Sequence, residues 1–267
     1  MVLTPQLAII TLTTDFGTSD LYVGVMKGVI LNINPRAQIV DITHAIPPQD
    51  LEAAAFLIDS AYRYFPNGTI HVIVVDPGVG STRRTIACQT KTACFVCPDN
   101  GVLTHILRDE SHIHAVAIES PAHFLPQISN TFHGRDIFAP VAAHLSRGVS
   151  IDDLGSPITQ PVQLPIPTPK LTEDRIVGHI IWIDHFGNLI ANISREVLES
   201  MTVQNGFVIH VNGVEIGHLN RSYAESAIGE VLAIIGSFGR LEVSINGGNA
   251  AQTLGVQRGD PITIRQM

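Results

Sequence analysis

The sequence contains few charged residues, and positive charge is the scarcer sign. Lys and Arg total 16 and Asp and Glu total 24 among 267 residues, which gives a formal net charge of −8 at pH 7. A net acidic chain without a basic run is a poor candidate for binding nucleic acid. Hydrophobic residues make up 45% of the chain, which is enough for a sizeable core and argues against disorder. The composition therefore indicates one large or two ordinary globular domains.

Cysteine is also scarce, with Cys88, Cys94 and Cys97 making up the whole set. An odd number at irregular spacing does not build a disulfide framework. Cys94 and Cys97 form a single CxxC, and no second CxxC or histidine pair accompanies it. Packing in an apolar strand is therefore favoured over a zinc or redox site.

Long apolar runs and common nucleotide or catalytic motifs are missing as well. No run is long enough to span a membrane, and residues 1–14 have neither a basic region nor a signal-peptide cleavage pattern. We therefore expect a cytoplasmic protein without a membrane partner. The chain has no GxxxxGK loop, no GxGxxG after its first strand, no HExxH and no GxSxG, which removes the enzyme classes that depend on them.

What the sequence does contain is a strand that ends in a charged turn. Residues 72–75 are all β-branched, which is typical of a strand buried on both faces. Asp76 ends this run, and a Pro-Gly-Val-Gly segment at residues 77–80 forces the chain to turn before Arg83 and Arg84. Ligands bind at the carboxyl ends of strands in open α/β sheets, so a charged site is one interpretation. A surface turn with an Asp–Arg ion pair is the other.

Strand-like and helix-like segments alternate through the first half of the chain. The alternation predicts an α/β N-terminal domain, residues 1–156, with right-handed crossovers and a mainly parallel sheet. Asp50 is expected to cap the second helix. The predicted strands are residues 7–13, 39–42, 70–75, 85–88, 93–96 and 114–118, and the predicted helices are residues 21–32, 51–64, 102–107 and a helix after residues 131–140 that ends near Gly148.

The second half begins with a change of composition. Five prolines lie between residues 156 and 170, and such a segment is extended and stiff, so residues 157–172 are interpreted as an interdomain linker. Short strands and glycine turns follow, which predicts a smaller all-β barrel over residues 173–267. The strands expected there are residues 176–183, 206–211, 231–235, 241–245 and 261–264.

Other polar residues are candidates for chemistry. Asp15 follows the first predicted strand, as Asp76 follows the core strand. His133 lies just ahead of a predicted helix; it is either an ordinary histidine or, with Asp76 and Arg83, part of a charged cluster that binds and orients a water. Asp15, Asp76 and His133 are also the residues that a metal site would use, although nothing at ligand spacing requires one.

The second domain offers a polar turn of its own. Asp184, Phe186 and Asn188 surround a glycine after a strand. A carboxylate, an aromatic ring and an amide suit a ligand with a cationic group and a flat ring. A hairpin turn with a buried Phe is the alternative.

Taken together, the motifs resemble one family across nearly the whole chain. They are Thr14-Asp-Phe-Gly17, Val75-Asp-Pro-Gly-Val-Gly80 with Arg83-Arg84, Pro98-Asp-Asn-Gly101, Phe132-His-Gly-Arg-Asp-Ile-Phe-Ala-Pro140, Asp184-His-Phe-Gly-Asn188 and Gly236-Ser-Phe-Gly239. The resemblance is to the S-adenosyl-L-methionine hydrolases (adenosine-forming), also called SAM hydroxide adenosyltransferases, which are relatives of fluorinase and chlorinase. It implies an α/β N-terminal domain, a β-barrel C-terminal domain, and a homotrimer with sites between subunits.

The resemblance also implies roles for individual residues. The catalytic set of the family falls on Asp76, Arg83 and His133, with Arg83 chosen over Arg84 by its place in the motif. The halogenases of the superfamily carry a tyrosine where Asp76 stands and lack this set. The implied substrate contacts are Asp15 with the ribose, Asp184 with the methionine amino group, Asn188 with the adenine, Ser237 near the methionine carboxylate, Tyr223 near the adenine, and Phe186 packed on the ligand.

The reaction implied by the resemblance is hydrolysis of S-adenosyl-L-methionine to adenosine and L-methionine. Water attacks the ribose C5′ in line with the departing sulfur, and Asp76, held by Arg83 and His133, orients the water. No metal or organic cofactor is expected. The alternatives are a nucleophilic halogenase of the same superfamily, a non-catalytic module that binds adenosine or S-adenosyl-L-methionine, and a metal-dependent phosphoesterase.

Overall fold

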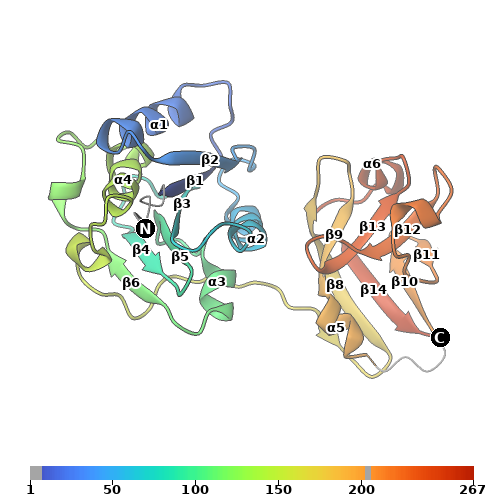
Figure 1. The fold of residues 1–267 in the computed structure, drawn as a ribbon. Coiled ribbons are helices and arrows are strands. Elements are labelled where there is room, and N and C mark those ends of the chain that lie inside the picture. Colours follow the sequence, from blue (N-terminus) through green and yellow to red (C-terminus); the bar gives the residue numbers. More distant parts are fainter. Residues whose placement is uncertain (1–7, 202–205) are drawn as a thin grey trace, which may run out of the picture. The chain divides into compact units, whose positions relative to one another are not determined.

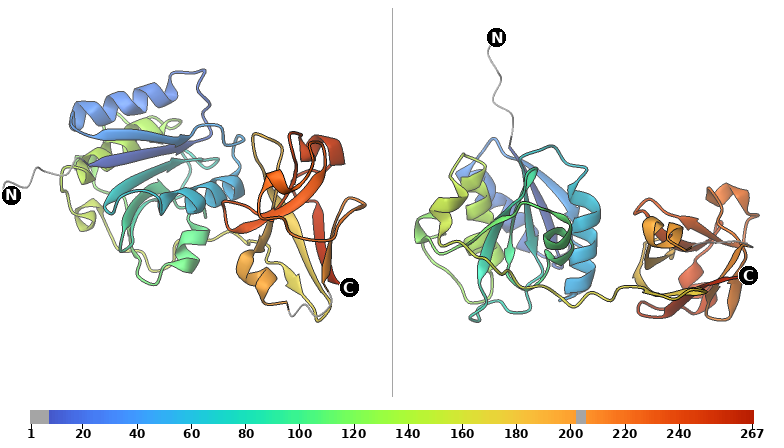
Figure 2. Two further views of the ribbon diagram at one scale, coloured as in Figure 1. Left: turned by 45° about the vertical axis from the view of Figure 1, so that its right-hand side comes forward. Right: turned by 90° about the horizontal axis from the view of Figure 1, so that it is seen from below.

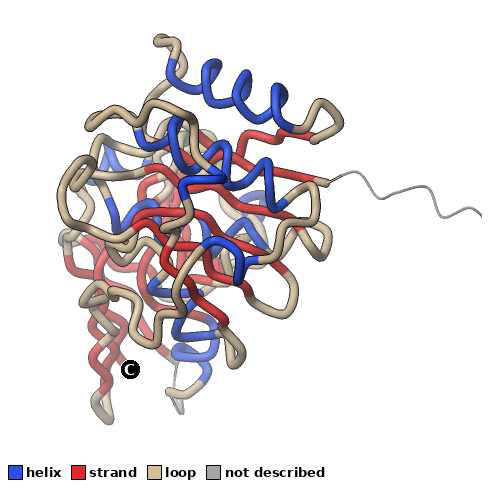
Figure 3. The backbone as a smooth tube through the Cα atoms, turned by 90° about the vertical axis from the view of Figure 1, so that its left-hand side faces the viewer, coloured by secondary structure: helices blue, strands red, loops and turns tan. Residues whose placement is uncertain are grey.

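The computed structural model describes residues 8–201 and 206–267 and divides into two compact units, Met1–Pro165 and Ile166–Met267. The division falls inside the predicted linker, and each unit has its own hydrophobic core. Strands and helices alternate along the first unit, whereas strands dominate the second. Figure 3 marks the helices in blue and the strands in red. Among the described residues, no helix is long and apolar enough to cross a bilayer.

The N-terminal unit is built on a six-stranded sheet in the order β2-β1-β3-β5-β4-β6 (Figure 1). The first four of these strands pair in parallel, which confirms the mainly parallel prediction, while β4 runs antiparallel to both β5 and β6. The turn between β4 and β5 is too short for a parallel crossover. The strands are β1 (Ile9–Thr14), β2 (Gln38–Thr43), β3 (Thr69–Val74), β4 (Thr85–Gln89), β5 (Ala93–Pro98) and β6 (His114–Ala117). Leu7, which the predicted first strand included, lies outside the described residues.

Helices cover both faces of this sheet (Figure 2). The steps from β1 to β2 and from β2 to β3 run in opposite directions, so right-handed crossovers place α1 and α2 on opposite faces. Asp50 caps α2 as predicted, accepting a hydrogen bond from the Ala53 N–H at 3.0 Å. The helical segments are α1 (Tyr22–Ile33), α2 (Leu51–Tyr62), α3 (Thr104–Asp109), α4 (Ala139–Leu145), the π-helix η2 (Gly134–Phe138), and the 3₁₀ turns η1 (Pro121–His123) and η3 (Ile151–Leu154).

Strand β3 is the centre of the core. All six of its residues are buried, as the β-branched run predicted, because helices pack on both faces of the sheet. One apolar cluster joins β1 and β3 to α1, η2 and α4. The rigid core therefore reaches to the point where β3 ends and Asp76 begins the turn.

The C-terminal unit is an antiparallel, nearly closed barrel with the strand order β11-β10-β14-β8-β9-β13-β12. The backbone N–H of Asn220, after β11, donates to the carbonyl of Ala233 in β12 at 2.8 Å, which links the two ends of the order. The strands are β7 (Lys170–Leu171), β8 (Arg175–Ile183), β9 (Leu189–Ser194), β10 (Phe207–Val211), β11 (Val214–Ile216), β12 (Val231–Ile235), β13 (Arg240–Ile245) and β14 (Pro261–Gln266), and the helical segments are α5 (Arg195–Glu199), η4 (Tyr223–Glu225) and α6 (Ala250–Leu254).

Three strands of this unit were not anticipated. β9 and β11 are absent from the sequence prediction, and β7 lies within the segment that was interpreted as linker. β7 pairs only with β8, so the last residues of the predicted linker already belong to the sheet of the barrel.

Candidate active site

Asp76, Arg83 and His133 form one hydrogen-bonded cluster. Nε of Arg83 donates to Oδ1 of Asp76 at 2.8 Å, and Nη2 of Arg83 donates to Oδ2. The same Nη2 lies 2.9 Å from Nδ1 of His133. The side chains of Asp76 and Arg83 are only 6% and 10% exposed, so this is a nearly buried, two-point ion pair rather than a surface pair. The structure thus brings together the three residues that the motifs singled out.

A glycine allows the two chain segments of the cluster to approach. Gly80 has a φ of +75°, and a Cβ built on it would lie 2.3 Å from the backbone oxygen of Asn130. No larger residue fits this contact. The turn that carries Arg83 therefore lies directly on the loop that leads to His133, and the Arg83 guanidinium stacks over the Phe138 ring at 5.7 Å from its centre.

His133 begins the helical segment instead of preceding it in a loop, as had been expected. Its backbone is already helical, with φ −64° and ψ −22°, and the π-helix η2 follows at once. Asp136, fully buried in η2, accepts hydrogen bonds from the backbone N–H and the hydroxyl of Ser129, each at 2.8 Å, and from Nε of Arg135 at 2.5 Å. These bonds close the loop onto the helix and fix the backbone of His133 between them.

The electrostatics favour a neutral His133. Burial lowers the pKa of its imidazole below the ordinary value and the charge of Arg83 lowers it further, although Asp76 and Asp136 act in the opposite direction. Because Arg83 donates to Nδ1, that nitrogen carries a lone pair and the proton of the neutral ring is on Nε2. The cluster therefore consists of a carboxylate, a guanidinium and a neutral imidazole.

Arg84 belongs to a different pair. Its Nε donates to Oδ2 of Asp99 at 2.7 Å, and Oδ1 of the buried Asp99 accepts from the backbone N–H of Val162 at 2.7 Å. This second pair secures the start of the proline-rich segment. The two adjacent arginines thus pair with different carboxylates: Arg83 pairs with Asp76, and Arg84 pairs with Asp99.

Asp15 lies at the same edge of the sheet as Asp76. β1 and β3 pair in parallel with Thr14 opposite Val74, so both carboxylates follow neighbouring strand ends. Oδ2 of Asp15 accepts from the backbone N–H of Gln49 at 2.8 Å.

An aromatic cluster joins the Asp15 turn to the segment of His133. The ring centres of Phe16 and Phe132 are 5.8 Å apart, and those of Tyr22 and Phe132 are 5.2 Å apart. Phe132 immediately precedes His133, and Phe16 immediately follows Asp15. The first unit therefore gathers all of its predicted site residues at the carboxyl edge of its sheet.

In the second unit, Asp184 and Asn188 are hydrogen-bonded to each other. Oδ1 of Asp184 accepts from the backbone N–H groups of Phe186 and Asn188 at 2.9 Å, and Oδ2 accepts from Nδ2 of Asn188 at 2.8 Å. Phe186 is 72% exposed, so the alternative of a buried Phe is wrong. The turn presents an aromatic ring outward beside a carboxylate that its own backbone holds in place.

Tyr223 and Ser237 lie on other turns of the barrel. The hydroxyl of Tyr223 donates to Oε1 of the buried Glu242 at 2.6 Å, and Ser237 is exposed in the turn between β12 and β13. Burial raises the pKa of Tyr223, as do its hydrogen bond to Glu242 and, to a smaller degree, the charge of Asp184. Tyr223 is therefore a neutral phenol whose hydroxyl is held by Glu242.

The cysteines form no comparable site. Burial raises the pKa of both Cys88 and Cys94 to about 12 and that of Cys97 well above its ordinary value. Thiols held in this state provide little thiolate for a metal or for redox exchange, in keeping with the packing interpretation. Across residues 8–201 and 206–267, no three His, Cys, Asp or Glu side chains gather as a metal-binding group.

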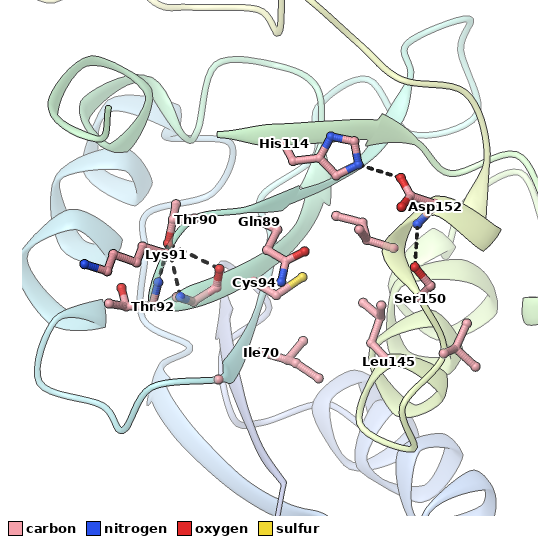
Figure 4. A pocket seen from close by; sticks show the side chains of 14 residues that line it. Ile70, Gln89, Thr90, Lys91, Thr92, Cys94, His114, Leu145, Ser150 and Asp152 are labelled. Carbon is pink, nitrogen blue, oxygen red and sulfur yellow. Dashed lines mark hydrogen bonds and ion pairs between the residues drawn. The ribbon is translucent and has the colours of Figure 1, made fainter. Parts of the chain in front are cut away.

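A separate pocket of about 370 Å³ opens at the amino ends of β3 and β5 (Figure 4). Its polar lining includes Lys91, Ser150 and a His114–Asp152 pair whose Nε2 and Oδ1 atoms are 2.6 Å apart. Ligands of open α/β sheets bind at the carboxyl ends of the strands, which is the other edge. None of the predicted site residues lines this pocket.

Sequence reasoning missed the residues that support the site. Asp136 and Ser129 hold the segment of His133, and Glu242 holds Tyr223. Asp136 belongs to the motif at residues 132–140, and a carboxylate at the start of an apolar helix is a sequence signal for a stabilising contact there. Glu242 occupies a strand position whose neighbours are all buried, and only the three-dimensional pairing reveals its partner.

Comparisons with known proteins cover nearly the whole chain. Residues 10–155 match the model of the SAM hydroxide adenosyltransferase N-terminal domain, and residues 178–263 match that of the C-terminal domain. The chain is 35% identical over 263 residues to the (R)-S-adenosyl-L-methionine hydrolase of Salinispora tropica, with 96% of this chain and 97% of the relative covered. It is 28% identical over 290 residues to the fluorinase of Nocardia brasiliensis, with 96% of each covered.

A solved structure shows the same fold. The crystal structure of an uncharacterised conserved protein from Thermotoga maritima matches with a TM-score of 0.90 and 37% sequence identity, covering 96% of this chain and all of the other.

Proposed function

The chain belongs to the SAM hydroxide adenosyltransferase family, and we infer from this and from its site that it hydrolyses S-adenosyl-L-methionine to adenosine and L-methionine. The observation that carries the inference is the Asp76–Arg83–His133 cluster at the end of the buried strand β3. A rigid, paired carboxylate at the carboxyl edge of an α/β sheet is suited to holding one small polar reactant, such as water.

The leaving group requires little assistance in this reaction. The sulfur of the substrate already carries a positive charge, so methionine departs as a neutral thioether and no general acid is needed. The difficult part is the nucleophile, because free water is a weak one. We assign Asp76 the task of orienting the water in line with the C5′–S bond and sharing its proton.

Arg83 and His133 prepare Asp76 for that task. Arg83 binds both carboxylate oxygens and leaves each with a further lone pair for water. Its positive charge also stabilises hydroxide character as the water loses its proton, and this effect is strong in a site with little solvent. The neutral His133 accepts from Arg83 and fixes the guanidinium in its plane.

The remaining candidates bind the substrate in this proposal. In the first unit, Oδ1 of Asp15 receives the ribose hydroxyls while Oδ2 stays on the Gln49 backbone. In the second unit, Asp184 pairs with the methionine ammonium, and Asn188, whose Nδ2 is held by Asp184, offers its Oδ1 to the adenine amino group. The ring of Phe186 packs on the ligand, Tyr223 lies near the adenine, and Ser237 lies near the methionine carboxylate.

We also propose a homotrimer in which residues of two subunits act on one substrate molecule. Dilution below the dissociation constant of the trimer would then abolish activity, while the two domains of each monomer stay folded. An activity-coupled sedimentation run measures both properties at once. A fully active monomer would contradict this assembly.

The reaction is tested by product identification in water enriched in oxygen-18. The protein is incubated with S-adenosyl-L-methionine in buffers with and without chloride or fluoride, and with and without a metal chelator. Adenosine labelled at its 5′ oxygen, in equal yield under every condition, is the expected result. A 5′-halo-adenosine would indicate the halogenase, loss of activity in chelator would indicate metal dependence, and tight binding without product would indicate a binding module.

A further inference from the structure

A buried histidine, His44, contacts both ends of the turn that carries Asp15. His44 directly follows β2 and is 6% exposed. Its backbone carbonyl accepts from the N–H of Gly17 at 2.8 Å, and its Nδ1 lies 2.9 Å from Oγ1 of Thr14. These two contacts hold the first and last residues of the turn 14–17, with Asp15 between them.

The hydroxyl of Thr14 also binds the backbone of the turn. It accepts from the N–H of Phe16 at 3.2 Å, so one hydroxyl contacts both His44 and the backbone of the turn. Thr14 is fully buried, and a hydroxyl without a hydrogen-bond partner there would carry its full desolvation penalty. The orientation of Asp15 is therefore tied to hydrogen bonds on either side of it in the chain.

Asp41 faces the opposite side of the imidazole and is itself bound by Lys27. Nε2 of His44 lies 3.1 Å from Oδ1 of Asp41, whose Oδ2 accepts from Nζ of Lys27 at 2.6 Å. Burial opposes the charge of Asp41, but the hydrogen bond from Lys27 and the nearby His44 outweigh it and hold the pKa of Asp41 below its ordinary value. The carboxylate of Asp41 thus faces the side of the imidazole opposite the one that contacts Thr14.

We propose that His44 is a positioning residue for substrate binding, which acts through Thr14 to hold Asp15 where it receives the ribose hydroxyls. The proposal rests on the proposed function, because it needs Asp15 to contact the substrate. His44 lies under the binding residue and outside the Asp76–Arg83–His133 cluster. Its loss therefore weakens the grip on the substrate more than it slows the chemical step.

The same sheet contains a matched pair that serves as a control. Oγ1 of Thr11 lies 2.8 Å from Nδ1 of His71, and both residues are fully buried. This pair bridges β1 and β3 in the interior, where His71 stacks on Phe95 with 5.2 Å between ring centres. The chemistry of the two Thr–His pairs is alike, but only the pair with His44 is attached to the Asp15 turn.

Thr14→Val and Thr11→Val are the most conservative tests, because each removes one buried hydroxyl and little volume. Thr14→Val and His44→Leu should raise the KM for S-adenosyl-L-methionine roughly tenfold, the equivalent of about one net hydrogen bond, with kcat nearly unchanged. Thr11→Val and His71→Leu should lower the thermal midpoint to a similar extent and leave KM at the wild-type value. His44→Gln, which keeps a hydrogen-bonding group, should recover part of the lost affinity.

Two results would overturn the proposal: a folded Thr14→Val protein with wild-type KM, or an equal rise of KM in Thr14→Val and Thr11→Val. Equilibrium binding of S-adenosyl-L-methionine by calorimetry separates this outcome from failure of the proposed function. If the wild type binds the substrate but forms no adenosine, the hydrolase assignment fails, while the affinity difference between the two threonine variants still decides the role of His44.

Discussion

The two units present their candidate residues in opposite ways. In the N-terminal unit, Asp76 and Arg83 are 6% and 10% exposed and are bound to each other and to His133. In the C-terminal unit, Phe186 and Tyr223 are 72% and 42% exposed, and Ser237 stands on an exposed turn. One unit thus offers a buried, preorganised cluster of charges, and the other offers mostly exposed side chains on turns of a barrel, with Asn188 the buried exception among its candidates.

This difference points to a division of labour. A buried ion pair costs desolvation and is rigid once it is formed, which suits groups that must hold a reacting water in line. Exposed groups on turns cost little to place and gain most of their value when a ligand covers them. We therefore expect substitutions in the first set to lower turnover and substitutions in the second set to weaken substrate binding.

The largest expected effect distinguishes the two adjacent arginines. Arg83→Ala should reduce kcat by about 10² to 10⁴, because it removes the group that pairs with Asp76 and is proposed to stabilise hydroxide character. Arg84→Ala is the matched control, since Arg84 pairs with Asp99 and not with Asp76, and its kcat should stay near the wild-type value. Steady-state kinetics on both variants decide the assignment, and a larger loss of kcat in Arg84→Ala would reverse it.

The next largest effect tests whether the barrel binds the substrate through Asp184. Asp184→Asn keeps an oxygen for the two backbone N–H groups that Oδ1 binds, so the turn persists. It removes the charge proposed to meet the methionine ammonium, and with it the oxygen that accepts from Nδ2 of Asn188. Loss of one partner of such a pair costs about 2–5 kcal/mol, which should appear as a higher KM. Asp260→Asn is the control, because Asp260 accepts from the Gln257 N–H in another turn of the barrel. An unchanged KM with a collapsed kcat in Asp184→Asn would remove Asp184 from the binding set.

The smallest effect on catalysis is expected at His71, in the core of the first unit. Burial lowers the pKa of His71 to about 4, so the unfolded chain binds an extra proton between about pH 6.5 and pH 4. The free energy of unfolding of this unit should therefore fall as the pH drops through that range, by at most about 3 kcal/mol. Denaturant unfolding of the wild type and of His71→Leu at pH 7 and pH 4.5 measures this pH-dependent contribution to the free energy of unfolding. An identical loss of stability in both proteins would show that His71 is not its source.

Much of the first unit could be predicted from the sequence because its signals are local. The β-branched run before Asp76 announces a strand buried on both faces, and Asp50 before an apolar periodic segment announces a capped helix. The pairing of Asp76 with Arg83 follows from a short glycine-containing turn between them. Each of these inferences needs only a few consecutive residues.

The features that escaped prediction depend on contacts between distant residues. β9 includes Asn192, a poor strand former, whose Oδ1 accepts from the backbone of His179 at 2.9 Å and whose Nδ2 donates to the Pro167 carbonyl at 2.9 Å. β11 has three residues, too few for a periodic pattern. The supporting role of Asp136 depends on Ser129, seven residues earlier across a loop. The proposed roles of the exposed barrel residues depend on a ligand that local sequence does not describe.

The central claim is that Asp76, Arg83 and His133 act as one unit on the attacking water. It is tested most directly by the turnover number and the thermal midpoint of Asp76→Ala, measured on one preparation, with His133→Ala and the double variant beside it. The account predicts a folded Asp76→Ala protein that still binds S-adenosyl-L-methionine and is slower by about 10² to 10⁴, and a double variant hardly slower than the worse single variant. A folded Asp76→Ala protein that releases adenosine at the wild-type rate would contradict it.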